Sequence, residues 1–303
     1  MGAGHNRSDR AAGNLRGIAL MLLSTLAISC MFGAVRHVSQ TVHPLEIAFF
    51  RMLFGLIAVV PWFFTLGLKP LRTRRLGLLG VRGVLNIIAM WAFFICLSLI
   101  PLDEATALGF TAPIFTTLLA VITFGEVVSA RRWAAIGVGF LGTLVVLRPG
   151  FQEVSTGALL ALCAAFMWGA CMVIIKSLSR TESSVTITLY MSVVMTPLAL
   201  VPALFVWSWP TGGELAWLIT IGTLGGVGQL AIAQALKEAE AHVVMPVDFV
   251  KLAWVSIIGY VAFAESPTVY TWLGGAMIFS VTSFIAYREH ALRKAGRAPV
   301  KLP

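Results

Sequence analysis

Charged residues are scarce in this sequence: only 12% of the 303 residues are Asp, Glu, Lys or Arg, about half the fraction usual in a soluble domain. The four cysteines lie in apolar stretches, with neither disulfide nor metal-site spacing. No G-x-x-x-x-G-K-[ST] loop and no H-E-x-x-H motif occurs, which argues against ATP drive within the chain and against zinc protease chemistry. We therefore expect no catalytic residues, no metal and no cofactor.

Apolar residues are abundant instead. They make up 58% of the chain, and long apolar runs recur from residue 15 to residue 287. A bilayer core of about 30 Å needs roughly 20 such residues per helix. The pattern predicts an all-α polytopic membrane protein in a lipid bilayer. The net charge of +9 does not indicate a nucleic-acid partner, because the basic residues lie in short loops between apolar runs.

The apolar runs predict ten transmembrane helices between a tail at 1–14 and a basic tail at 288–303. The expected spans are 15–34, 44–67, 78–100, 105–124, 133–148, 157–175, 185–206, 215–235, 242–264 and 271–287. Seventeen Lys and Arg residues lie in the two tails and the even-numbered loops, whereas the odd-numbered loops hold only Arg36 and Arg148. The positive-inside rule therefore predicts a multi-pass inner-membrane protein with both termini cytoplasmic.

The two halves of the chain resemble each other at a shift of about 140 residues. The overlay places Arg36 on Lys176 and Glu126 on Glu265, and both glutamates look like structural residues at helix ends. Since five is odd, two consecutive five-span repeats must point in opposite directions across the membrane. Such inverted repeats are typical of secondary transporters, which handle substrate near the midplane between the repeats. We expect repeats at 15–148 and 157–287 around a central cavity, with alternating access.

Four stretches resemble the EamA-type members of the drug/metabolite transporter superfamily. They are "HPLEIAFFR", "PLDEATALGFTAPIFTTLLAVITFGE", "RRWAAIGVGFLGTLVVLRPG" and "ALKEAEAHVVMPVDFVKLAW". The resemblance covers about residues 15–287, and within the family the pattern is similar to bacterial S-adenosylmethionine uptake and riboflavin transporters. The second half lacks the "FFR" and "RPG" signatures of the first. The resemblance implies ten helices, cytoplasmic termini, a central cavity and a small-molecule metabolite as substrate.

The stretch "MPVDFVKLAW" places Asp248 and Lys251 inside the ninth span. Residues three apart share a helix face, so the two charges can neutralise each other. One interpretation is a structural ion pair; the other is a cavity wall where the pair meets a charged substrate group or a proton, with Phe249 beside it. Pro246 is expected to break the backbone ladder there. The counterparts in the fourth span, near Gly109 and Ala112, are uncharged.

Three other charged residues are candidates for gating or coupling. Glu46 and Arg51 are five apart, about 140° around the second span, so they are poorly placed to pair within it. Arg51 is expected to reach another helix or to snorkel, and a structural role is the alternative. Arg82 lies near the cytoplasmic end of the third span, where snorkelling is the simpler interpretation.

Uncharged polar and aromatic residues complete the candidate substrate site. Asn86, near Gln229 in the repeat overlay, and Gln234 are either cavity hydrogen-bonding groups or interhelical ones. The remaining candidates are aromatic residues suited to stacking, namely Trp91, Trp168 and Tyr190. The glycines of the fifth and tenth spans are candidates for contact between protomers of a homodimer, or for support at the periphery of the fold.

These features predict a secondary transporter for a small organic metabolite of the S-adenosylmethionine, amino-acid or vitamin class. An uncoupled facilitator and a multidrug or metabolite exporter are the alternatives. An intramembrane enzyme does not fit, because no serine or cysteine is visibly paired with a base. Proton coupling through Asp248 is a hypothesis, since a carboxylate can titrate when its partner is withdrawn.

Overall fold

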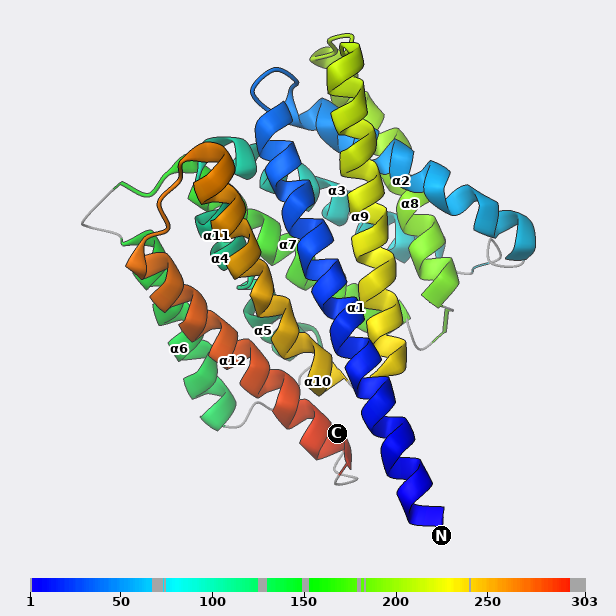
Figure 1. Cartoon of the computed structure of the whole chain (residues 1–303), viewed down its shortest axis with the longest axis vertical. Helices are drawn as coiled ribbons and strands as arrows, with labels where there is room; N and C mark the ends of the chain where they lie inside the picture. Colours follow the sequence, from blue (N-terminus) through cyan, green and yellow to red (C-terminus); the bar gives the residue numbers. More distant parts are fainter. Residues whose placement is uncertain are drawn as a thin grey trace.

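The computed structural model describes residues 2–66, 73, 75–124, 130–148, 153–178, 181–182, 184–239 and 241–294. Within these residues every regular element is helical (Figure 1). The helices are α1 (Gly2–Val38), α2 (Pro44–Leu66), α3 (Leu76–Leu99), α4 (Leu102–Gly109), α5 (Ala112–Phe124), α6 (Ala130–Leu147), α7 (Thr156–Leu178), α8 (Ser184–Phe205), α9 (Gly212–Glu238), α10 (Ala241–Val244), the 3₁₀ helix η2 (Met245–Phe249), α11 (Val250–Phe263) and α12 (Val269–Lys294).

Each expected span coincides with helical structure, but two of them are interrupted. The ninth changes from α10 to η2 to α11, which confirms the break expected at Pro246. The fourth is divided at Phe110 and Thr111 into α4 and α5, although Leu102–Phe124 as a whole is a segment long and apolar enough to cross a membrane. The first helix begins at Gly2 rather than near residue 15, because helical backbone bonding continues past the apolar segment.

The chain is an all-helical polytopic membrane protein. Six helical segments of the described chain are long and apolar enough to cross a bilayer, and shorter apolar helices accompany them. The largest buried cluster draws on α1, α2, α3, α4, α6, α7, α8, α9 and α11, so the core runs through the centre of the bundle. The first helix begins and α12 ends at the same end of the bundle (Figure 1).

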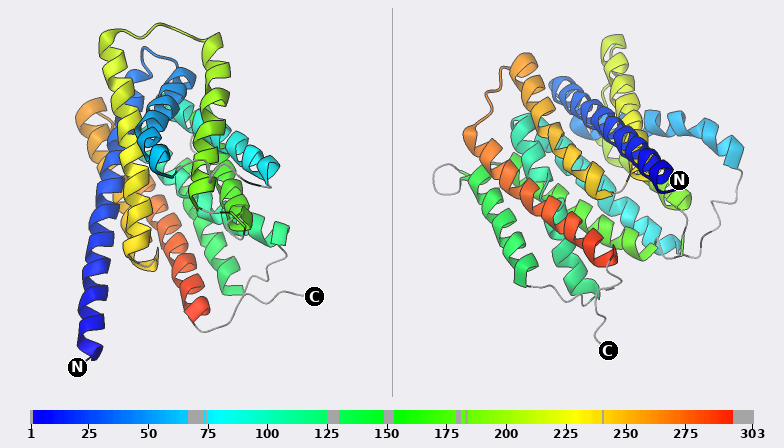
Figure 2. Two further views of the ribbon diagram at one scale, coloured as in Figure 1. Left: turned by 90° about the vertical axis from the view of Figure 1, so that its right-hand side faces the viewer. Right: turned by 60° about the horizontal axis from the view of Figure 1, so that its bottom comes forward.

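Small residues allow the closest helix pairs to form. The helix α1 packs along α9 and α3 packs along α7, and Figure 2 shows the first pair side by side from two more directions. A Cβ atom built on Gly17 would lie 2.5 Å from Ala239 Cβ, and one on Gly157 would lie 2.5 Å from Ile100 Cγ2. Both positions therefore require glycine for the backbones to approach this far.

The glycines of the fifth and tenth spans face each other within one chain. A Cβ atom on Gly142 of α6 would lie 2.9 Å from the carbonyl oxygen of Gly274 in α12. These small residues thus support the α6–α12 contact at the side of the bundle, one of their two expected roles. Homodimerisation stays a prediction.

Candidate functional site

The interruption of the ninth span brings an acid and a base together inside the bundle. Pro246 lies in the first turn of η2, where its missing N–H and fixed φ suit the start of a helix but not its interior. The 3₁₀ turn ends at Phe249, and α11 continues from Val250. Asp248 therefore lies on the 3₁₀ turn and Lys251 in the first turn of α11.

Asp248 and Lys251 form a direct ion pair. Lys251 Nζ lies 2.8 Å from Asp248 Oδ1, and the side chains are 14% and 19% exposed for Lys251 and Asp248, respectively. The expected self-neutralisation is therefore present. Lys251 Nζ also lies 5.6 Å from the ring centroid of Phe110, within the range of a cation–π contact. The cation thus connects the break in the ninth span to the break in the fourth.

Aromatic rings line the junction between these two breaks. The Phe249 ring stacks on Phe279 of α12 at a centroid distance of 4.3 Å and an interplanar angle of 26°. It also meets the Phe110 ring at 5.7 Å. Trp254, one turn further along α11, is half-buried, and its buried indole Nε1 has no hydrogen-bond acceptor among the described residues. A planar organic group would find stacking partners here.

The break in the first half has no charged side chain of its own. The helix α4 ends at Gly109, Thr111 donates from Oγ1 to the Leu108 carbonyl at 2.7 Å, and α5 begins at Ala112. The hydroxyl thereby occupies one carbonyl that the interrupted helix leaves without its usual donor. The first break thus satisfies its Leu108 carbonyl with a hydroxyl from its own residues. The second break, in contrast, contains a pair of opposite charges.

The aromatic candidates Trp91 and Trp168 lie on the neighbouring helices α3 and α7. The Trp168 ring meets Phe93 at 5.0 Å, and Phe93 in turn meets Phe32 of α1 at 5.1 Å. Trp91 is half-buried, and its buried Nε1 has no acceptor within the described part of the chain. These rings join α1, α3 and α7, but none of the described contacts links them directly to Asp248 or Lys251.

The amide and phenol candidates are more dispersed. Asn86 donates from Nδ2 to the Met195 sulfur of α8 at 3.2 Å, which is an interhelical contact. Gln229 and Gln234 lie on exposed faces of α9, and Gln234 Nε2 donates to Glu238 Oε1 at 2.9 Å. Tyr190 packs against a small cluster around Leu79 of α3. The structure therefore does not bring these residues to the Asp248–Lys251 pair, and their role in substrate binding stays a prediction.

The charged residues of α2 are separate, as their spacing predicted. Glu46 is fully buried, and its Oε2 accepts from Ser208 N at 3.2 Å and Ser208 Oγ at 3.1 Å. Arg51 reaches α3, where its Nη1 lies 3.1 Å from the Met90 sulfur. The two side chains do not form an ion pair with each other.

Arg82 does not snorkel to the surface. It is only 8% exposed, and its backbone carbonyl lies 3.6 Å from the Cys171 sulfur of α7. The expectation of snorkelling was wrong because α7 packs over this face of α3, which removes the path to the interface. Its proposed part in gating or coupling stays a prediction.

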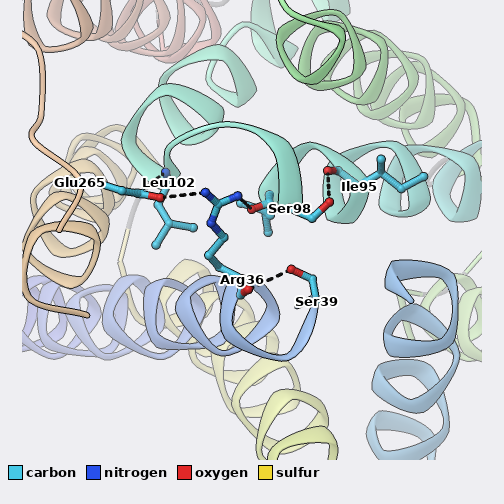
Figure 3. Close-up of polar contacts among 7 residues, drawn as sticks. Arg36, Ser39, Ile95, Ser98, Leu102 and Glu265 are labelled. Carbon is cyan, nitrogen blue, oxygen red and sulfur yellow. Dashed lines mark hydrogen bonds and ion pairs between the residues drawn. The ribbon is translucent and has the colours of Figure 1, made fainter. Parts of the chain in front are cut away.

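A second charged cluster, which the sequence did not single out, lies at the end of the bundle away from the start of α1 (Figures 1 and 3). Arg36 Nη2 lies 3.2 Å from Glu265 Oε1, and Arg36 Nη1 donates to the Leu97 carbonyl at 2.9 Å. Glu265 Oε2 accepts from Leu102 N at 3.0 Å. One ion pair thus ties together the end of α1, the end of α3, the start of α4 and the segment after α11.

A cavity of about 320 Å³ adjoins this cluster, lined by Arg36, Ser39, Gln40, Ser98, Phe263 and Glu265. Glu265 was expected to be a structural residue at a helix end. In the sequence, only the overlay of charged helix ends, Glu126 on Glu265 and Arg36 on Lys176, could have pointed to this cluster. The ion pair itself depends on residues 229 positions apart and was not readable from the sequence. Glu126, its counterpart in the repeat, lies outside the described residues.

Comparison with known proteins adds three findings. The model of the EamA-like transporter family matches residues 15–148 and again 155–287. The chain is 35% identical over 246 residues to a riboflavin transporter of Rhizobium johnstonii, with 80% of each chain covered. It is 30% identical over 275 residues to an S-adenosylmethionine uptake transporter of Rickettsia felis, covering 91% of this chain and 94% of the relative.

Two further similarities are more distant. A pseudopaline exporter of Pseudomonas aeruginosa is 26% identical over 271 residues, with 86% of this chain and 93% of the exporter covered. A solved crystal structure of a protein superposes with a TM-score of 0.61 at 20% identity, covering 92% of this chain and 99% of that one. The structural likeness concerns the fold alone.

Proposed function

Because the chain belongs to the EamA-like transporter family, we propose that it carries a small organic metabolite across the bacterial inner membrane by alternating access. It is a transporter and not an enzyme. Relatives named for S-adenosylmethionine and riboflavin uptake indicate the chemical range, and we propose a substrate of the S-adenosylmethionine, amino-acid or vitamin class. Metabolite export is the second candidate, which the similarity to the pseudopaline exporter favours.

The observation that carries this proposal is the meeting of two interrupted spans around the Asp248–Lys251 pair. Broken helices expose backbone groups and charges inside a membrane protein only where they line a cavity or meet a partner. Here the ion pair lies beside the rings of Phe110 and Phe249. We assign to this junction the role of substrate contact, in which the substrate competes with the pair for its charges and stacks on its rings.

Reciprocal contacts between the halves support the inverted-repeat architecture. A contact between residue i of the first half and residue j of the second recurs between residues close to i + 140 and j − 139. The related close contacts are Gly17–Ala239 with Gly157–Ile100, and Phe54–Gly222 with Val194–Gly83. An internal two-fold relation produces this reciprocity. At the same shift, the counterpart of Asn86 is Gly225, whereas the overlay of the two sequences had placed Asn86 near Gln229.

The same relation supports the choice of candidate site. Phe110 and Phe249 are 139 residues apart, so they are counterparts in the two halves, and their rings are in contact. A residue can touch its own counterpart only beside the axis that relates them. The Asp248–Lys251 junction therefore lies at the interface between the proposed repeats, where secondary transporters handle their substrates.

The Arg36–Glu265 cluster supports alternating access by closing one end of this interface. With both termini cytoplasmic, as loop charge predicts, this end faces away from the cytoplasm. Four segments converge on one half-buried ion pair, so separating α1 from α11 there requires the pair to part. We propose that it opens and closes during transport. Glu46, Arg51 and Arg82 stay candidates for gating or coupling.

Counterflow into proteoliposomes tests the proposal. We expect saturable uptake of at least one metabolite from a panel led by S-adenosylmethionine, riboflavin and amino acids. A disulfide across the closed end tests alternating access: a Cβ atom on Gly33 of α1 would lie 2.7 Å from Ile258 Cγ2 of α11, within bridging reach. In a background lacking the native cysteines, oxidation of Gly33→Cys/Ile258→Cys should stop uptake, and reduction should restore it.

The controls are each cysteine variant alone, which oxidation should leave active. Absence of saturable flux across the panel contradicts the transport proposal. Undiminished flux through the cross-linked pair contradicts alternating access at this end and favours an uncoupled path elsewhere.

A further inference from the structure

Arg51 is a cation held inside the bundle without an anionic partner. It extends from α2, and its Nη1 lies 3.4 Å from the Met52 sulfur and 3.1 Å from the Met90 sulfur. Its Nε is buried and has no hydrogen-bond acceptor among the described residues. No carboxylate in that part of the chain lies within ion-pair distance of it. Thioether sulfur is a weak acceptor, so these contacts do little for a guanidinium charge.

The guanidinium lies where both halves of the chain meet. Met31 of α1 and Gly225 of α9 adjoin it, in addition to Met90 of α3: a Cβ atom on Gly225 would lie 3.0 Å from the Met31 sulfur and 3.3 Å from Arg51 Nε. Glycine at this position therefore leaves room for the guanidinium against α9. The residue as a whole is partly exposed.

Two other cations of the bundle have anionic partners. Lys251 pairs with Asp248 at 2.8 Å and Arg36 with Glu265 at 3.2 Å. Glu46, the acid on the same helix as Arg51, is bound to Ser208 instead. Withdrawing a cation from water is unfavourable unless an anion or good acceptors replace the water, and the described contacts supply neither to Arg51.

From this geometry we propose that Arg51 binds the carboxylate or phosphate group of the transported metabolite. The proposal rests on the proposed transport function and narrows its substrates to those with such a group. A guanidinium presents a planar fork of donors that matches both groups in a bidentate manner, and an ammonium does not. The methionines near it, Met31, Met52 and Met90, would pack against the adjoining apolar part of the ligand, because thioether chains adapt to irregular shapes.

Two matched pairs of probes test the assignment by direct binding to the purified full chain. S-adenosylmethionine and its decarboxylated form differ by a carboxylate, and riboflavin 5′-phosphate and riboflavin differ by a phosphate. Wild-type protein should bind the member that carries the carboxylate or phosphate, in at least one pair, about tenfold or more tightly than the member that lacks it. Arg51→Met should bring that ratio close to one, mainly by weakening binding of the carboxylate- or phosphate-bearing probe, and Arg51→Lys should fall between.

Lys237→Met is the matched control, because it removes one positive charge from an exposed position on α9 and should leave the ratio unchanged. Preference in neither pair for the member that carries the carboxylate or phosphate, or no binding of any probe, overturns the assignment. So does an Arg51→Met protein that keeps the wild-type ratio.

Thermal unfolding of the ligand-free protein separates ligand binding from a structural role. Removal of an uncompensated charge should raise the Tm of Arg51→Met by roughly 2–4 °C, whereas loss of a structural contact lowers it. A lowered Tm together with an unchanged binding ratio contradicts the proposal. Wild-type protein that binds the carboxylate- or phosphate-bearing probe but moves nothing in proteoliposomes contradicts the transport proposal and leaves the assignment of Arg51 intact.

Discussion

Phe110 lies in the turn that divides the fourth span, and Phe249, 139 residues later, ends the 3₁₀ turn that interrupts the ninth span. Only the second of these two breaks carries charged residues. In the first half the break is closed by the Thr111 hydroxyl, which donates to the Leu108 carbonyl. In the second half Asp248 and Lys251 occupy the positions of Gly109 and Ala112. The backbone interruption is thus common to both halves, and the ion pair belongs to one of them.

This difference separates two requirements of a transporter. A break in each half provides the irregular backbone that a substrate site between helices needs. A charge pair in both breaks would place four charges around one axis, with the cost of withdrawing each from water. One charged and one uncharged break let aromatic surface from the first half meet the charged group of the second, as Phe110 and Lys251 do.

The largest expected effect comes from breaking the ion pair. Asp248→Asn leaves Lys251 without its anion and should cost about 2–3 kcal/mol of stability, between the values for exposed and fully buried pairs. The double variant Asp248→Asn/Lys251→Met should recover most of that loss in thermal unfolding, because no charge is left unpaired. Its flux should stay below about a tenth of wild type if the pair contacts the substrate.

Recovery of both stability and flux in the double variant would assign the pair a purely structural role. Glu238→Gln is the control, since it changes an exposed partner of Gln234 on α9 and should alter stability by no more than about 0.5 kcal/mol.

A smaller effect is expected from making the second break resemble the first. Pro246 has Ala107 as its counterpart 139 residues earlier, so Pro246→Ala gives both halves the same residue before the break. An added N–H removes the proline's obstacle to backbone bonding at this position, which should lower flux several-fold. Pro202→Ala within α8 is the matched control, with flux unchanged. Unaltered flux in Pro246→Ala would mean that the interruption is not needed for transport.

The smallest effect is expected from the ring that joins the two breaks. Phe110→Leu removes the cation–π contact with Lys251 and should cost about 0.5–1 kcal/mol of stability. In a Lys251→Met background the same change should cost less, and a double-mutant cycle in thermal unfolding measures the difference. Additive effects would indicate that the two breaks are energetically independent.

The sequence was enough to predict the class of fold and most helix positions. Apolar runs longer than a bilayer core determine membrane helices almost by themselves, because no other spanning structure with those runs satisfies the backbone. The break at Pro246 was equally local, since proline lacks the N–H that a helix interior needs. The ion pair between Asp248 and Lys251 followed from a spacing of three residues.

Contacts between residues that are distant in the sequence could not be predicted from such local patterns. The break at Phe110 was missed although its neighbours mark it: Gly109 ends α4, and Pro113 in the first turn of α5 lacks the N–H that would bond to the Gly109 carbonyl. Arg82 was expected at the interface, but α7 covers it. The dispersed amides Gln229 and Gln234 were grouped by repeat position and polarity, whereas the face that each helix turns toward its neighbours depends on packing.

The sequence by itself determined that this chain is a helical membrane protein with a charged, proline-broken ninth span, because hydropathy, proline chemistry and helical spacing act over a few residues. Only the tertiary structure decided that Arg36 meets Glu265, that Phe110 meets Phe249 and that Arg51 meets sulfur instead of a carboxylate. Those outcomes depend on which helices approach closely enough to touch, and small residues such as Gly17, Gly157 and Gly225 set that approach jointly with partners more than 50 positions away.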